Sequence, residues 1–90
     1  MYFEGCAQLE FGHKVVRFVM HRVEGKGVHW RADLRMKSRD GSLGRALGLD
    51  NVSSMAPGAD TALADFLGWA RNHGIAVDEA GRAACARALA

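Results

Sequence analysis

Residues 28 to 37 of this chain alternate without a break between apolar and polar side chains, from Val28 to Lys37. Only a β-strand sends successive side chains to opposite faces, so the alternation predicts a strand with one dry face and one solvated face. The pattern also constrains the neighbouring strands, because it determines which of their residues share the dry face. The chemistry of the outer surface of a whole sheet therefore follows from this segment.

Two more strands are predicted before this one. Residues 3–11 place apolar and small residues at odd positions, and residues 15–23 are rich in β-branched and aromatic side chains. Gly12-His13 suits a two-residue hairpin turn, and the segment 25–27 suits a three-residue loop with glycine in the left-handed conformation. The sequence thus predicts a three-stranded antiparallel meander over residues 1–39.

The two turns can be tested against each other through the register that each implies. The first turn pairs Phe11 with Lys14, and the second pairs Glu24 with Val28. Both registers put the same residues of the middle strand on the dry face: Val16, Phe18 and Met20. We therefore adopt these pairings.

A two-residue loop at Gly25-Lys26 is the alternative for the second turn. It would bring Arg17 and His21 into the core, which costs several kcal/mol unless both side chains are paired. We reject this register.

Helical spacing appears only in the last third of the chain. Asp60 is predicted as the N-cap of a helix that ends before Gly74, and Asp78 as the cap of a second, alanine-rich helix. The apolar stripe of the first helix, packed on the dry face, contains Leu63, Phe66, Leu67 and Ala70. We expect a single α+β domain over residues 1–90, with a meander at 1–39, an irregular connection at 40–58 and a helical pair at 59–90.

Composition narrows the class of protein. A hydrophobic content of 49% with 24% charged residues is ordinary for a globular domain, and no apolar run approaches the ~20 residues of a membrane span. Cys6 and Cys85 are expected to be reduced, because no basic segment followed by an apolar block indicates a signal peptide. We expect a cytoplasmic protein without membrane contact.

The predicted outer face carries an apolar stripe of Val15, Val19 and Val23, interrupted by polar residues. Solvated sheet faces usually carry other residue types, so the stripe favours a covered surface. The cover is either the second helix or the connection, or else another chain, meaning a second copy or a different protein. The predicted partner-binding residues are Tyr2, Val15, Arg17, Val19, His21, Val23, Arg31 and Arg35.

Nucleic acid is the alternative ligand of this face. Residues 1–45 hold nine Lys or Arg against five Asp or Glu, whereas residues 46–90 hold three against five. Arg31, Arg35 and Lys37 could follow a phosphate backbone, but Asp33 on the same face would repel it.

The motifs of common enzymes are missing from the sequence. It has no glycine-rich phosphate loop, no CxxC, no HExxH and no serine in an elbow motif. Three residues, Glu4, His21 and His29, approach a metal-ligand set, but Arg31 beside them would oppose a cation. We therefore expect no enzyme, no cofactor, no metal and no small-molecule substrate.

The favoured function is a small protein-binding module or a homodimer. A regulator or inhibitor of the kind that phages and mobile elements encode fits this size, although no residue points to that origin.

Overall fold

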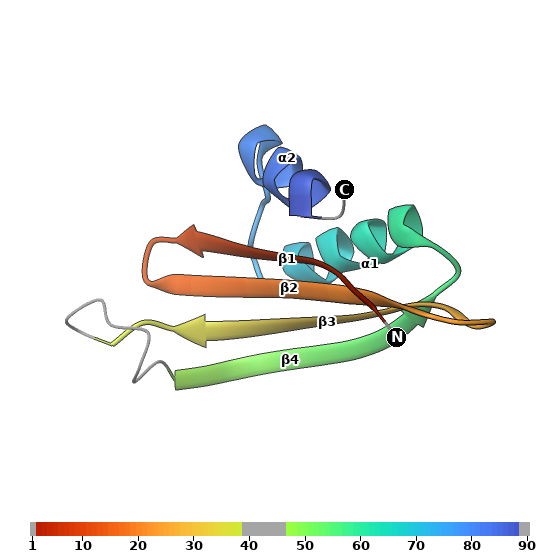
Figure 1. The fold of residues 1–90 in the computed structure, drawn as a ribbon. Helices are drawn as coiled ribbons and strands as arrows, with labels where there is room; N and C mark the ends of the chain where they lie inside the picture. The colour runs from red at the N-terminus through yellow and green to blue at the C-terminus, as the bar shows by residue number, and fades with distance from the viewer. Residues whose placement is uncertain (1, 39–46, 89–90) are drawn as a thin grey trace.

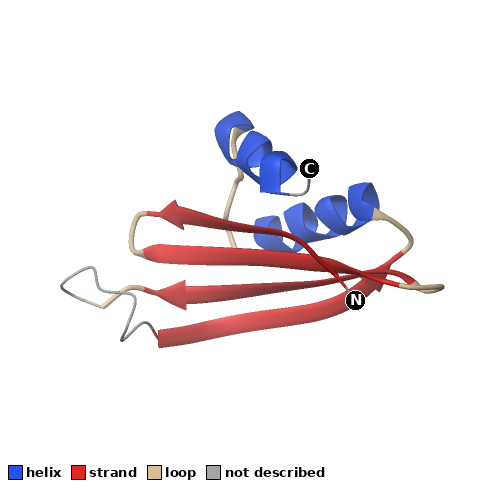
Figure 2. Cartoon of the chain, viewed as in Figure 1, coloured by secondary structure: helices blue, strands red, loops and turns tan. Residues whose placement is uncertain are grey.

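The structure is a computed structural model that describes residues 2–38 and 47–88, with side chains described for residues 7–38 and 48–87. Four antiparallel strands form one sheet in the order β1-β2-β3-β4, followed by two helices (Figure 1). The elements are β1 (Tyr2–Phe11), β2 (Lys14–Val23), β3 (Gly27–Met36), β4 (Leu47–Ala56), α1 (Ala59–Asn72) and α2 (Glu79–Ala88). Both helices lie on the same side of the sheet (Figure 2).

The predicted α+β class, with an antiparallel meander and two C-terminal helices, is confirmed. The predicted number of strands is wrong, because β4 occupies residues 47–56 of the segment that we expected to be irregular. Gly48, Asp50 and Asn51 disfavour a strand by propensity, and few apolar residues mark its inner face. Residues 39–46 of that segment lie outside the described part of the chain.

The first hairpin has the predicted register over most of its length. Phe11 pairs with Lys14 around the turn, and Gly12 adopts a φ of 63°, which mirror-image hairpin turns require. The register changes by one residue between Phe3 and Gly5, so that Phe3, and not Glu4, lies opposite His21. The predicted pairing is therefore correct from Gly5 onward and wrong before it.

The second hairpin is displaced by two residues from the predicted register. Val23 pairs with Gly27, and the Lys26 N–H donates to the Val23 carbonyl over 3.0 Å. Gly25, the third residue of this turn, has a φ of 75°, as a type II turn requires. A shift of two residues leaves every side chain on its predicted face, because the side-chain period of a strand is two.

The core lies between the inner face of the sheet and α1. Phe66 is fully buried and stacks on Phe18, with ring centroids 4.4 Å apart. The helix buries Ala62, Phe66 and Ala70, whereas Leu63 and Leu67 are only partly buried.

The predicted cap at the start of α1 is wrong, and the predicted caps at its end and on α2 are confirmed. Gly58 is the N-cap residue of α1, so Asp60 lies inside the first turn. Gly74, with a φ of 75°, ends the helix in a Schellman motif, in which the Ile75 N–H donates to the Ala70 carbonyl over 2.9 Å. Asp78 caps α2 by accepting a hydrogen bond from the Gly81 N–H over 2.8 Å.

α2 packs against β1 on the helical side of the sheet. Cys85 is fully buried there, and Gly81 lies beside Leu9 of β1. Neither helix therefore reaches the opposite face, which we call the outer face. No helix among the described residues is long and apolar enough to cross a membrane.

Candidate functional site

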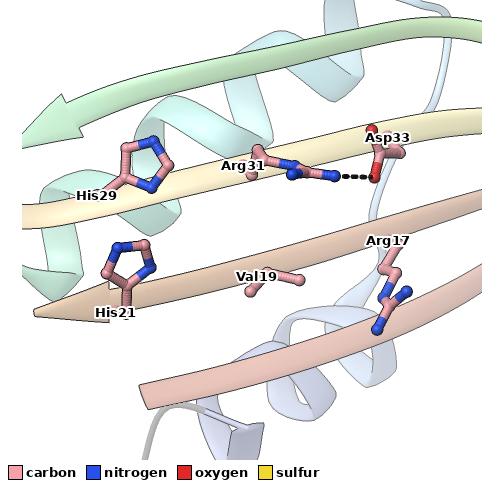
Figure 3. A pocket seen from close by; sticks show the side chains of 6 residues that line it. All are labelled: Arg17, Val19, His21, His29, Arg31 and Asp33. Carbon is pink, nitrogen blue, oxygen red and sulfur yellow. Dashed lines mark hydrogen bonds and ion pairs between the residues drawn. The ribbon is translucent and has the colours of Figure 1, made fainter. Parts of the chain in front are cut away.

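A hollow of about 270 Å³ lies in the middle of the outer face (Figure 3). Its lining comes from alternate residues of the two central strands: Arg17, Val19 and His21 of β2, and His29, Arg31 and Asp33 of β3. Because strand residues of one parity share a face, the same alternation that buries Phe18 and Met20 exposes this set.

Two histidines form one end of the hollow. His21 and His29 are direct cross-strand partners, and their ring centroids are 4.8 Å apart (Figure 3). The Nε2 atom of His29 also lies 2.6 Å from the Ser53 hydroxyl of β4, within a hydrogen bond. Contacts from both neighbouring strands therefore orient the His29 ring.

Charged side chains form the other end. The Arg31 guanidinium lies 3.4 Å from the Asp33 carboxylate, and its side chain is 60% exposed. Arg17 is the direct partner of Asp33 on β2. A long exposed ion pair of this kind contributes little to stability, so Arg31 can exchange Asp33 for another carboxylate at low cost.

Val19 lies between the two ends, directly opposite Arg31. It is half-buried, so the floor of the hollow is apolar while its rim is polar. Such a surface matches the interaction sites of proteins, in which an apolar centre is bordered by polar groups.

The predicted stripe is not continuous, because Val15 is only 5% exposed. Val15 lies between Glu10 of β1 and Arg35 of β3, and the Lys37 ammonium contacts the Glu10 carboxylate over 3.0 Å. This ion pair joins residues on either side of β2, so the stem of Lys37 passes near Val15 and can shield it from water. Val15 therefore exposes little surface to a partner, and its place in the binding surface stays a prediction.

The structure places the other predicted residues around the hollow rather than in it. Val23 is half-buried at the end of β2, and Arg35 is exposed beside Val15. Lys37, proposed for nucleic acid, is 17% exposed and paired with Glu10. Tyr2 lies opposite Arg22, but its side chain is outside the described part of the chain.

The contribution of β4 to the outer face was not predicted from the sequence. Ser53 and Met55 lie opposite Arg31 and His29, and Met55 is 44% exposed. The signal that could have revealed them is the placement of two apolar residues, Val52 and Ala56, on the inner side of the strand, four residues apart. Two apolar residues are too few to separate a strand from an irregular segment.

In the part of the chain that the structure describes, His21 and His29 are the members of a possible metal-ligand set on the outer face. No group of three or more His, Cys, Asp or Glu side chains there could hold a metal ion. The side chain of Glu4, considered with His21 and His29 as a metal ligand, is not described.

Comparisons with models of protein families, with curated proteins and with solved structures gave no match.

Proposed function

We propose that this protein is a non-catalytic protein-binding module that acts through the hollow of the outer face. The observation that supports the proposal is that both helices cover one face of the sheet and leave the other uncovered, with a half-buried valine among charged and aromatic rim groups. Of the two coverings within the chain that the sequence allows, α2 is excluded, because it packs on β1 from the helical side, and residues 39–46 of the connection lie outside the described part of the chain.

The chemistry of the hollow favours a partner segment with one apolar and one acidic side chain. The apolar group would rest on Val19, and the carboxylate would replace Asp33 as the partner of Arg31. A carboxylate held by a guanidinium gains a charge-assisted hydrogen bond, and burial of the valine adds the apolar term.

Nucleic acid is the second candidate, and the basic residues of the outer face favour it. Arg17, Arg31 and Arg35 line or flank the hollow. Asp33 lies among these arginines and would repel phosphate, so the face matches a duplex or single strand less well than it matches a protein.

The test compares three baits in affinity capture from the cells that make the protein: the wild type, Val19→Glu and Ala64→Glu. Ala64 is exposed on α1, so its variant adds the same charge on the opposite side of the molecule. We expect the wild type and Ala64→Glu to capture the same partner protein and Val19→Glu to lose it. Circular dichroism checks that each variant folds. Equal capture by all three baits would remove the hollow as the binding site.

A fluorescent oligonucleotide titration separates the second candidate. The nucleic-acid proposal would replace the protein-binding one if oligonucleotide binding falls steeply with salt. Binding should then also weaken in the double variant Arg31→Glu with Arg35→Glu, but not in the surface control Arg71→Glu.

A further inference from the structure

The free edge of β4 is a second surface on which the chain presents binding groups. The strand order makes β1 and β4 the two edges of the sheet, and α2 packs against β1. β4 packs against β3 and α1, and Figure 1 shows no described helix or strand beyond its far edge. Long edge strands are normally protected by lysine, proline, a β-bulge or a cover, because unpaired backbone groups attract other strands. The bulge of β4 lies at Leu49, so the regular part of its edge runs from Asp50 to Ala56. Between Leu49 and Met55, the one charged residue is Asp50.

Two hydrogen bonds show which backbone groups of β4 point outward. The Lys37 N–H donates to the His13 carbonyl over 2.7 Å, so odd-numbered residues of β3 bond to β2 and even-numbered ones face β4. From Val28 to Leu34, even-numbered residues of β3 pair with even-numbered residues of β4, so the odd-numbered residues of β4 from Asn51 to Met55 face the free edge. In agreement, the Asn51 N–H donates to its neighbour, the Asp50 carboxylate, over 2.8 Å. The outward backbone groups are therefore those of Asn51, Ser53 and Met55.

We infer that β4 pairs antiparallel with β4 of a second copy of this chain, about a two-fold axis at Val52. Outward residues can bond only to outward residues, so odd positions have to pair with odd positions. With Val52 opposite its own copy, Asn51 lies opposite Ser53, and Leu49 lies opposite Met55. The two chains together form an eight-stranded antiparallel sheet.

The register about Val52 is selected by the apolar side chains. Leu49 and Met55 are the exposed large hydrophobic residues of the described chain, at 43% and 44% exposure. Met55 pairs with His29 and so lies on the outer face, and Leu49, the bulge residue of β4, borders a shallow hollow that Asp33 and Arg35 of that face also line. Each is three residues from Val52, so the two-fold axis brings Leu49 of one copy close to Met55 of the other. The symmetry produces two such pairs. A shift of the partner strand by two residues separates both pairs.

Charge and space also permit this pairing. Asp50 lies opposite Ser54 of the other copy, so the two carboxylates do not face each other. The Asn51 N–H exchanges the Asp50 carboxylate for the carbonyl of the partner's Ser53, and Asp50 keeps His73, whose Nε2 lies 2.8 Å away. α1 contacts β2, β3 and β4. Two helices centred on the two β3 strands would be separated by three strand spacings, about 14 Å, which exceeds the 8–10 Å of helices in contact.

A cysteine scan tests this register directly. In a Cys6→Ser background, Val52→Cys places two thiols opposite each other across the two-fold axis, at a Cα separation that a disulfide tolerates. The matched control is Ser54→Cys, which lies on the same face of the same strand but opposite Asp50. Under mild oxidation of the purified chain we expect a covalent dimer from Val52→Cys at least tenfold in excess over Ser54→Cys. Equal cross-linking of the two variants, or none from Val52→Cys, would overturn the inference.

A charge exchange provides the second test. We expect Leu49→Lys and Met55→Glu each to reduce the dimer fraction in light scattering on a sizing column, and the double variant to restore it. A wild type that remains monomeric at a concentration of about 1 mM would also overturn the inference. Val19→Glu leaves β4 unchanged, so its dimerisation should match that of the wild type. The outcome of these tests is therefore independent of the proposed function of the hollow.

Discussion

Replacement of Gly27 by alanine tests the position of β4, the element that the sequence did not predict. An ideal Cβ at Gly27 would lie 2.3 Å from the Ala56 carbonyl oxygen, at the end of β4, and 3.3 Å from the Pro57 Cα. Gly27 also has a φ of 111°, which L-residues rarely adopt. Gly25, two residues earlier, has a φ of 75° and nothing within 4 Å of an added Cβ. The two glycines thus share a turn but differ in their surroundings.

The magnitudes follow from these two environments. Gly25→Ala places alanine in the left-handed region, at a cost of about 1–2 kcal/mol. Gly27→Ala incurs about 1–3 kcal/mol for its backbone conformation. The overlap with a backbone oxygen adds to this cost, because relief requires separation of the buried Val28–Ala56 pair. We therefore expect Gly27→Ala to cost at least about 2 kcal/mol more than Gly25→Ala, a difference of about 8–16 °C in Tm.

Urea unfolding followed by tryptophan fluorescence measures both variants, with an unchanged m-value as the check that the unfolded states are comparable. Both substitutions reduce the entropy of the unfolded chain to the same extent, so this contribution cancels in the comparison. Equal free energies of unfolding for Gly25→Ala and Gly27→Ala would refute the close approach of β4 to the second hairpin.

Three further predictions concern the core, the buried thiol and the cover of Val15. Phe66→Ala should lower the free energy of unfolding by about 3–5 kcal/mol in urea titration, because the ring is fully buried; a loss under 1 kcal/mol would contradict its position. Burial raises the pKa of the Cys85 thiol, so the folded state keeps its proton at a pH where the unfolded chain loses it. Stability should therefore fall as the pH rises above the pKa of the unfolded thiol, about 8.5, and in a Cys6→Ser background Cys85→Ala should remove this slope. Lys37→Ala should lower the free energy of unfolding by about 1 kcal/mol, because it exposes Val15. Lys37→Met should lower it much less, because it keeps the apolar stem and removes only the charge. Equal losses for the two variants would assign the effect to the ion pair.

In the strands between residues 7 and 36, the face of each side chain could be predicted from the sequence, although the exact pairing of the second hairpin could not. The second hairpin is displaced by two residues, yet Val16, Phe18 and Met20 are buried as predicted. The reason is that the side-chain period of a strand is two, so an error of two residues preserves each face. The caps at Gly74 and Asp78 were also predictable, because they depend on local backbone chemistry.

The candidate site was predictable only in part. Four of the predicted residues line one hollow, as their shared parity implies: Arg17, Val19, His21 and Arg31. The pairing register of β2 with β3 places His21 beside His29. The ion pair beside Val15 joins Glu10 of β1 to Lys37, the residue after β3, across the intervening strand β2. The alternation of residues within one strand cannot predict such a contact.

The sequence by itself determined the fold class and the two faces of the sheet, because alternation and helical spacing act over a few residues. Only the tertiary structure decided that residues 47–56 form an edge strand. Their propensity is weak, and pairing with β3 supplies the hydrogen bonds that stabilise them as a strand. It also decided that both helices occupy one face and leave the other uncovered, since this depends on where α2 packs after the turn at Gly74.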